Sequence, residues 1–471
     1  MMAYTKGMKR WVAGVTLAAA AAAGAPGRAA GQQAVQLTTV TTVGAATSAA
    51  PRQVITYEEA LRLAQQRNVA LRQSENAAAS DAVSVRQARS QLLPDLRFTT
   101  QGGQSYGRNF NQNDGAIVNT TTQTMNAGLS SSLTLFDGQK NLSNIRATQA
   151  SQAASEQTVV RARQTAVFSV ASNYVALVTQ QEQLRVREEA LAAQQDQEAL
   201  VKAYVDAGKR PISDLYTQQA AVASARLDLT NARRALELAR IDVMSTLQLD
   251  PAGEYEFVTP AIPQQATVAA TPSLDSLITL AARQRSDLQA LDSRLKAADA
   301  SVQAATATRW PTLSLSLGYN TSFSSLSNFS FTDQLDQRRG GSIALGVSLP
   351  VFDRFTTSNA SQQARIQADN ARIALESQKR EVGLQVRRAW LDLTSAREQL
   401  AAAEAQVKAA DQALLTSRER YNAGAATLVE LAQARATQVQ AASAMVNARY
   451  NLVLQGTVMD YYTGGLAIPT S

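Results

Sequence analysis

The fold is decided by residues 342–351, which read SIALGVSLPV. Apolar and small or polar side chains alternate along this stretch, and a period of two is typical of a β-strand with one apolar face. Three further segments, at about 96–101, 127–135 and 312–319, follow the same pattern and carry Ser, Thr, Gly or Gln on the other face. Together with their flanking residues the segments are about 9–11 residues long, which is enough for tilted strands to cross a bilayer. The apolar positions of the first stretch are Ile343, Leu345, Val347, Leu349 and Val351.

The chain contains two copies of one plan. Residues from about 56 to 250 match those from about 273 to 465 at an offset of roughly 216, and such self-similarity indicates a repeated structural unit. Each half is predicted to run helix, two strands, long helix, tight turn, shorter helix. Residues 251–272, rich in proline, are interpreted as a linker. Repeated pieces include Ala207-Gly208 and Ala423-Gly424, and Asn231-Ala232-Arg233 and Asn447-Ala448-Arg449.

Helix periodicity and helix length predict a long helical wall. The predicted long helices, about 138–206 and 354–420, carry apolar residues every seven positions, as coiled-coil-like packing requires. At 1.5 Å per residue the first spans roughly 103 Å, so two shorter helices end to end are needed to cover it. An ordinary helix bundle or a filament remains open on this pattern alone. The shorter predicted helices lie at about 57–93, 212–249, 273–309 and 427–462.

The N-terminus has the order of a secretory signal in residues 1–30, with a basic start, an alanine-rich apolar core and small residues after it. The alternative is an uncleaved membrane anchor, but the apolar run is shorter than the roughly 20 residues that a spanning helix needs. Residues 31–55 are interpreted as a flexible leader and 466–471 as a tail. Removal of the four basic residues of the signal reduces the net charge from +7 to about +3, which gives no case for nucleic-acid binding.

Catalysis is not expected. The chain has no Cys and no His, so thiol nucleophiles, zinc–thiolate sites and the commonest general base are missing. No P-loop pattern occurs either, so the chain has no evident source of energy of its own. We therefore expect that the chain is not an enzyme and that it binds neither a cofactor nor a metal.

Four strands cannot close a barrel, and an open sheet edge in lipid would leave backbone groups unpaired at several kcal/mol each. Copies from other chains must therefore complete the sheet, and three copies would give twelve strands, enough for an open pore. The polar stretches 105–125 and 320–340 are interpreted as loops at the cell exterior. The predicted fold is thus mainly α with a membrane β-barrel portion.

Recurring motifs mark the strand-to-helix corners and the helix turns of the two halves: Leu135-Phe136-Asp137-Gly138, Leu349-Pro350-Val351-Phe352-Asp353, Tyr204-Val-Asp-Ala-Gly208, Tyr421-Asn-Ala-Gly424 and, at the tail of the second half, Tyr450-Asn451-Leu452. This ordered, duplicated set of motifs resembles the TolC family of outer membrane efflux proteins over nearly the whole mature chain. The resemblance implies a homotrimer with a twelve-stranded barrel in outer membrane lipid and a twelve-helix periplasmic tunnel. It also implies a periplasmic adaptor protein and an inner-membrane transporter as partners at the tunnel tip.

The resemblance places the turns at 204–215 and 421–431 at the far tip of the tunnel. Where some family members have a basic residue that closes the tip, this chain has Ala426, and Lys209 and Arg210 add charge to the first turn instead. The alternative is that the acidic candidates are ordinary solvated residues near helix starts, where acidic side chains are common. The positions that match the aperture are Ser213, Asp214, Tyr421, Glu430 and Gln433. The adaptor-docking candidates are Tyr204, Ala207, Gly208, Lys209, Ala423 and Gly424.

The leading hypothesis is a passive exit duct for efflux or type I secretion, opened by docking of an adaptor and a pump. A trimeric structural or adhesive rod anchored in the outer membrane is the alternative. The transported substrate is not readable from the sequence, because a wide wet tunnel discriminates little.

Overall fold

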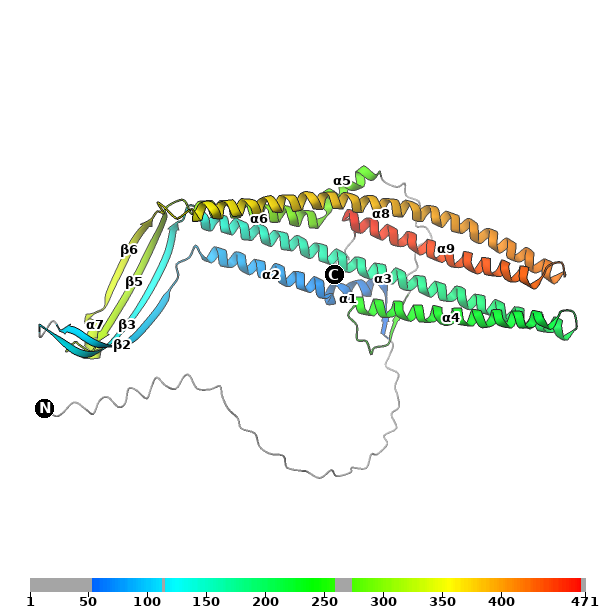
Figure 1. Ribbon diagram of the computed structural model, residues 1–471, viewed down its shortest axis with the longest axis horizontal. Coiled ribbons are helices and arrows are strands. Elements are labelled where there is room, and N and C mark those ends of the chain that lie inside the picture. Colours follow the sequence, from blue (N-terminus) through cyan, green and yellow to red (C-terminus); the bar gives the residue numbers. More distant parts are fainter. Residues whose placement is uncertain (1–52, 112–114, 259–272, 467–471) are drawn as a thin grey trace, which may run out of the picture. The chain divides into compact units, whose positions relative to one another are not determined.

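A computed structural model of the chain describes residues 53–111, 115–258 and 273–466 (Figure 1). The predicted signal (1–30) and most of the predicted leader, linker and tail lie outside the described residues.

Two long helices dominate the structure. Helices α3 (Lys140–Asp206) and α8 (Thr356–Asn422) have 67 residues each, which is about 100 Å at 1.5 Å per residue. Helices α2 (Val69–Ser90) and α4 (Ile212–Thr246) pack along α3, while α9 (Leu428–Thr463) packs along α8 (Figure 1). The predicted pairing of each long helix with shorter ones is thereby confirmed. Within the described residues, none of the helices combines the length and the apolar character needed to cross a membrane.

The heptad positions form the packed seams. Val170, Tyr174 and Leu177 of α3 are buried in one core cluster, and Val386 and Leu393 of α8 are buried in another. Along α8 the buried positions continue as small residues at the same spacing of seven, which lets neighbouring backbones approach closely. These small residues are Ala389, Ala396, Ala403 and Ala410.

The first helix of each half is broken, which corrects the predicted continuous helices 57–93 and 273–309. Helix α1 (Tyr57–Arg67) ends at Asn68, and α5 (Leu274–Gln284) ends at Arg285, before α6 (Ser286–Ala307). Both break residues are extended, with ψ of 120° and 116°. Asn68 then caps α2, because its side-chain oxygen accepts a hydrogen bond from the Leu71 N–H at 3.0 Å. The apolar periodicity runs on through both breaks and so conceals them.

A short parallel strand pair joins the predicted leader to the predicted linker. Strand β1 (Gln53–Ile55) pairs with β4 (Tyr255–Phe257), and Ile55 and Phe257 are buried in the core cluster that contains Tyr174. The predicted flexible leader (31–55) and the predicted linker (251–272) therefore each contain an ordered strand.

The second sheet has four antiparallel strands in the order β2-β3-β5-β6. Three of them are longer than predicted: β2 (Arg97–Asn111) has 15 residues, β3 (Ala116–Phe136) has 21 and β5 (Thr312–Ser324) has 13, whereas β6 (Gly340–Ser348) has 9. Most of the predicted loop 105–125 is therefore strand. The segment is polar, which favours a loop, but its threonines suit a pleated strand. The predicted loop 320–340 also contains a helix, α7 (Phe331–Gln337).

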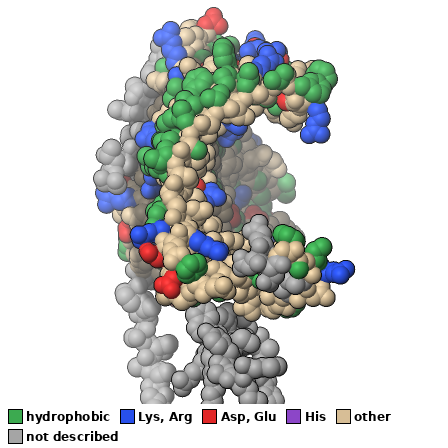
Figure 2. Space-filling model, turned by 90° about the vertical axis from the view of Figure 1, so that its left-hand side faces the viewer, with side chains coloured by type: hydrophobic (Ala, Val, Ile, Leu, Met, Phe, Trp, Pro, Cys, Tyr) green, Lys and Arg blue, Asp and Glu red, His purple; other side chains and the backbone are tan. Residues whose placement is uncertain are grey.

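The strand register sorts the sheet into two chemically different faces. Leu315 lies opposite Leu133 on one side and Leu345 on the other, while Ser316 lies opposite Ser132 and Ala344. Because directly opposed residues of antiparallel strands share a face, one face is apolar and the other carries small polar side chains, as the alternation predicted. Figure 2, which views this end of the molecule, shows hydrophobic side chains gathered along the outer side of a curved surface.

At the strand-to-helix corner the backbone comes very close to the end of α6. Gly138 has a φ of +67°, and a Cβ there would lie 2.6 Å from the Trp310 Cβ and 2.7 Å from the Ala307 carbonyl oxygen. This glycine therefore satisfies both a left-handed backbone and a close approach.

Candidate functional site at the hairpin tips

The hairpin of α3 and α4 ends in a tight turn of defined geometry. The Lys209 N–H donates to the Tyr204 carbonyl at 2.8 Å, and the Gly208 N–H donates to the Val205 carbonyl at 2.9 Å. Gly208 has a φ of +68°. This pair of bonds around a left-handed glycine is a Schellman motif, which satisfies the last carbonyls of a helix.

The hairpin of α8 and α9 ends in the same turn. The Ala425 N–H donates to the Arg420 carbonyl at 2.8 Å, the Gly424 N–H donates to the Tyr421 carbonyl at 3.0 Å, and Gly424 has a φ of +74°. The duplicated Ala-Gly pairs thus build two equivalent tips.

The hydrogen bonds define which residues of the two turns are equivalent. Counted from the glycine of each turn, Tyr204 corresponds to Arg420, and Tyr421 corresponds to Val205. The two tip tyrosines therefore stand one position apart in the repeat. Tyr421 is only 1% exposed, whereas Tyr204 is half-buried at the edge of the same cluster.

The two tips pack against each other through an apolar cluster. Ala426 is buried in it, so this position contributes apolar packing between the two tips. The buried members are Val201, Tyr421, Ala426, Leu428 and Leu431, and partly buried Tyr204, Val205, Leu215 and Leu414 surround them.

Arg210 joins the first tip to the second. Its guanidinium carbon lies 4.6 Å from the centre of the Tyr421 ring, and its Nη2 donates to the Tyr421 carbonyl at 3.4 Å. Burial raises the pKa of the Tyr421 hydroxyl, Arg210 lowers it, and Asp214 raises it further. The phenol is therefore neutral at physiological pH.

Glu430 lies at the start of α9 in a local network. Its backbone N–H is capped by the Thr427 hydroxyl at 3.2 Å, and its carboxylate lies 3.7 Å from Arg420. The carboxylate is half-exposed, so this ion pair contributes little stability. This geometry is that of an ordinary acidic residue at a helix start, which is the alternative given above for the aperture acids. The exposed carboxylate is also compatible with a position facing the lumen.

The other aperture candidates are spread over the tips. Asp214, in the first turn of α4, is half-buried and close enough to Tyr421 to affect its pKa, whereas Ser213 and Gln433 are exposed. Within one chain, the charge of Asp214 therefore acts on Tyr421.

Five of the six adaptor-docking candidates present an open surface. A Cβ added at Gly208 or Gly424 would meet no atom within 4 Å. Besides the two glycines, the exposed candidates are Ala207, Lys209 and Ala423.

The structure also has a groove behind the tips, which the sequence did not predict. A cavity of about 370 Å³ lies between α3, α8 and α9 and is lined in part by Arg435 and Arg418. Arg435 is 9% exposed and donates to the Ala193 carbonyl at 2.8 Å. Burial lowers the pKa of its guanidinium, and the charge of Arg418 lowers it further. Arg435 lies four residues after Leu431 and seven after Leu428, so it falls on the buried stripe of α9. This spacing could have predicted that Arg435 is buried.

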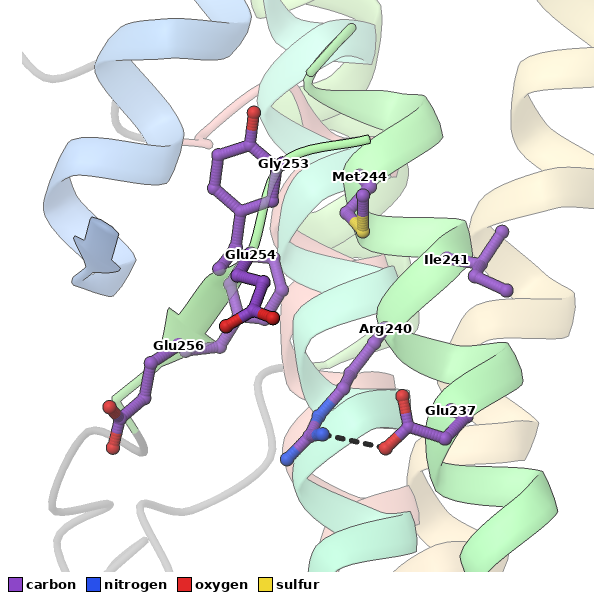
Figure 3. A pocket seen from close by; sticks show the side chains of 9 residues that line it. Glu237, Arg240, Ile241, Met244, Gly253, Glu254 and Glu256 are labelled. Atoms are coloured by element: carbon purple, nitrogen blue, oxygen red, sulfur yellow. Dashed lines mark hydrogen bonds and ion pairs between the residues drawn. The ribbon is translucent and has the colours of Figure 1, made fainter. Parts of the chain in front are cut away.

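A second cavity, of about 340 Å³, lies beside the far half of α4 (Figure 3). Glu254 and Glu256 of the β4 segment stand on one side of it, and on the other Arg240 pairs with Glu237 at 2.6 Å. Among the described residues no group of His, Cys, Asp or Glu is arranged to hold a metal ion. We assign this cavity no role.

Comparison with known proteins agrees with the duplicated architecture. The model of the family described as "Outer membrane efflux protein" matches residues 60–247 and 277–463, once in each half. The chain is similar to outer membrane efflux protein BepC of Brucella suis, with 24% identity over 335 residues and 70% of each chain covered. It is 27% identical to protein CyaE of Bordetella pertussis over 309 residues, 65% of this chain and 64% of CyaE.

The fold is similar to that of solved channels of the same kind. The crystal structure of CusC superposes with a TM-score of 0.76 at 19% identity, covering 87% of this chain and 92% of that chain. The family model covers most of the chain and meets the two halves at equivalent places. The chain therefore belongs to the outer membrane efflux protein family: it is a protein of the outer membrane, with its helices in the periplasm, and serves as an exit duct for efflux or secretion.

Proposed function

We propose that three copies of the chain close a twelve-stranded barrel in the outer membrane above a twelve-helix periplasmic tunnel. The observation that carries this proposal is the four-stranded sheet itself, which has one apolar face and one small polar face. Within the described residues, β2 and β6 each pair with a strand on one side only. Neighbouring copies would satisfy both edges, because lipid offers no hydrogen-bond partner to a free edge.

The duct works passively in this proposal. An inner-membrane transporter supplies the energy and a periplasmic adaptor protein connects it to the hairpin tips. The equivalent Schellman turns support this arrangement, since they offer adaptor hairpins two similar docking points per chain, six per trimer. The docking surface consists of Tyr204, Ala207, Gly208, Lys209, Ala423 and Gly424.

The tips also form the aperture in this proposal. Threefold repetition of Asp214 and Glu430 around a narrow lumen would attract cations and repel anions. Ser213, Tyr421 and Gln433 complete the proposed aperture, with Tyr421 fixed by the packed tip cluster rather than free to move.

Single-channel recording of the purified protein in a planar bilayer tests the duct. We expect discrete, cation-selective conductance steps, and we expect Asp214→Ala with Glu430→Ala to reduce the cation preference. A structural or adhesive rod, the alternative function, would show no discrete steps. An unchanged conductance and selectivity in the double variant would refute the aperture assignment, and crosslinking in native membranes that gave only monomers would refute the trimer.

Bulky substitutions test the docking surface. Gly208→Trp with Gly424→Trp is expected to abolish efflux in cells while the purified channel still conducts. The matched control is Gly208→Asn with Gly424→Asn, because asparagine tolerates the left-handed backbone and adds little bulk. Normal efflux by the folded tryptophan variant would contradict docking at the tips.

A further inference from the structure

The strands of the large sheet are joined at one end to the long helices, and at the other end β5 leads into α7. In the proposed duct this second end faces the cell exterior. Two side chains of one face of β5 contact the α7 segment. The Thr321 hydroxyl donates to the Leu335 carbonyl at 2.7 Å, and the rings of Phe323 and Phe331 lie 5.1 Å apart.

Those two contacts reveal on which face of the sheet α7 lies. Successive side chains of a strand point to opposite faces, so Thr321 and Phe323 share a face with Leu317 and Tyr319. The register of β5 is continuous here, with Tyr319 opposite Leu129 and no bulge between them and the strand end. Helix α7 therefore packs on the apolar face of the sheet and not on the polar face proposed to line the lumen.

The segment is a built element and not a loose loop. Gln334 is 1% exposed; its Nε2 donates to the Phe329 carbonyl at 2.9 Å and its Oε1 accepts from the Ser324 N–H at 3.0 Å. The Ser330 hydroxyl caps the helix by accepting from the Asp333 N–H at 3.2 Å. These bonds fix the position of the helix relative to the end of β5.

The outward surface of this element combines apolar and charged side chains. Leu326 is 48% exposed, Phe329 57% and Phe331 37%. Arg338 and Arg339 follow at the end of the helix and are exposed, and Arg339 forms an exposed ion pair of 2.9 Å with Asp336. Segments that lie at the boundary between lipid headgroups and acyl chains typically carry Phe and Leu on one face and arginines that reach phosphate on the other.

We propose that residues 325–339 form an anchor on the outside of the barrel, which lies in the exterior leaflet of the membrane and contacts lipid. Leu326, Phe329 and Phe331 enter the boundary between headgroups and acyl chains, and Arg338 and Arg339 contact lipid phosphates. This inference rests on the proposed function, because the apolar face contacts lipid only in a barrel. In this proposal α7 sets the depth at which the barrel lies in the membrane, and it does not enter the mouth of the pore.

Spin labels at single cysteines test the anchor, and the absence of native cysteine makes each label unique. We would label Phe329→Cys, Leu317→Cys on the apolar face and Ser316→Cys on the polar face. Each trimer is reconstituted in vesicles of phosphatidylcholine with phosphatidylglycerol. Accessibility to oxygen, which concentrates in lipid, is compared with accessibility to a water-soluble nickel complex. We expect the label at 317 to favour oxygen, that at 316 to favour nickel, and that at 329 to favour oxygen several-fold.

The three labels separate the two ways of failing. If the label at 317 lies in lipid and the label at 329 is open to nickel, the anchor is wrong and the barrel stands. If the labels at 316 and 317 are both open to nickel, the proposed barrel itself is wrong. Leu326→Cys repeats the measurement should labelling at 329 disturb folding. Arg338→Gln with Arg339→Gln, carried with the label at 329, is expected to raise its nickel accessibility, and an unchanged value would overturn the role given to the arginines.

Discussion

The guanidinium of Arg210 stacks on the ring of Tyr421, with 4.6 Å between the guanidinium carbon and the ring centre. The two residues are 211 positions apart and belong to the turns of different hairpins. This contact is part-buried and lies beside an apolar cluster that also joins the tips. Opening of the tunnel by separation of the two hairpins would have to break it.

Removal of this contact should loosen the tips. Arg210→Ala loses a cation–π contact worth about 0.5–2 kcal/mol, so we expect larger or more frequent conductance steps in a planar bilayer. Arg210→Lys keeps the charge but loses the flat guanidinium face, and we expect an intermediate conductance. Identical recordings for the parent and a folded Arg210→Ala protein would show that the contact plays no part in closure.

Tyr174 should be sensitive to loss of its hydroxyl. The group donates to the Val258 carbonyl, and burial, followed by the neighbouring Tyr57, raises the pKa of Tyr174 to about 12. Tyr174→Phe should therefore cost about 1 kcal/mol of stability at neutral pH. The folded protein holds this proton between pH 10 and about 12 while the unfolded chain releases it, so stability falls as pH rises through that window. Thermal unfolding followed by circular dichroism should show a weaker alkaline loss in Tyr174→Phe than in the parent.

Tyr421 provides the matched contrast. Its hydroxyl is buried and, among the described residues, has no hydrogen-bond partner, so Tyr421→Phe removes an unsatisfied group. The expected effect on the melting temperature is zero or a small increase. A loss as large as that of Tyr174→Phe would mean that the Tyr421 hydroxyl is hydrogen-bonded in the assembled channel.

Much of the fold could be predicted because its signals are local and repeated. The alternation along Leu313, Leu315 and Leu317 survives in the register of the sheet, and the seven-residue spacing of Val386 and Leu393 survives in the packed seam. The tip turns were found for the same reason, since a left-handed glycine after a helix leaves a readable mark.

What could not be predicted depends on contacts between distant residues. Nothing near Ile55 or Phe257 announces that they pair across some 200 positions. The helix breaks at Asn68 and Arg285 interrupt no apolar pattern, and the break at Arg285 depends on partners from α8. The stacking of Arg210 on Tyr421 could not be read from either turn alone.

The buried ion pair at the second break should be costly to disrupt. Arg285, 3% exposed, makes two hydrogen bonds of 2.9 and 2.6 Å to Asp287, and its Nη1 donates to Gln385 at 2.7 Å. Asp287→Asn leaves the guanidinium buried without its carboxylate, which typically costs about 3–5 kcal/mol. We expect a clear fall in melting temperature, and a smaller fall when Arg285→Met is combined with Asp287→Leu. A double variant that melts as low as the single one would contradict this account.

The same pair should contribute to acid sensitivity. Burial alone would raise the pKa of Asp287, but the hydrogen bonds and charge of Arg285 outweigh it and hold that pKa below the ordinary 3.8. The stabilisation is therefore present above pH 3.8 and is lost as pH falls through the folded pKa. Unfolding midpoints measured between pH 5 and 2 should converge for the parent and the double variant.

Gly138 and Gly208 separate backbone strain from close packing. Their φ values are nearly the same, +67° and +68°, but a Cβ at Gly138 would lie 2.6 Å from the Trp310 Cβ, while one at Gly208 would meet nothing within 4 Å. Alanine in a left-handed conformation costs roughly 1–2 kcal/mol at either site. Gly138→Ala must in addition move the end of α6 away from the strand-to-helix corner, and neither neighbour is a flexible side-chain end. We therefore expect Gly138→Ala to lower the melting temperature at least twice as much as Gly208→Ala, and an equal effect of the two would show that the corner yields freely.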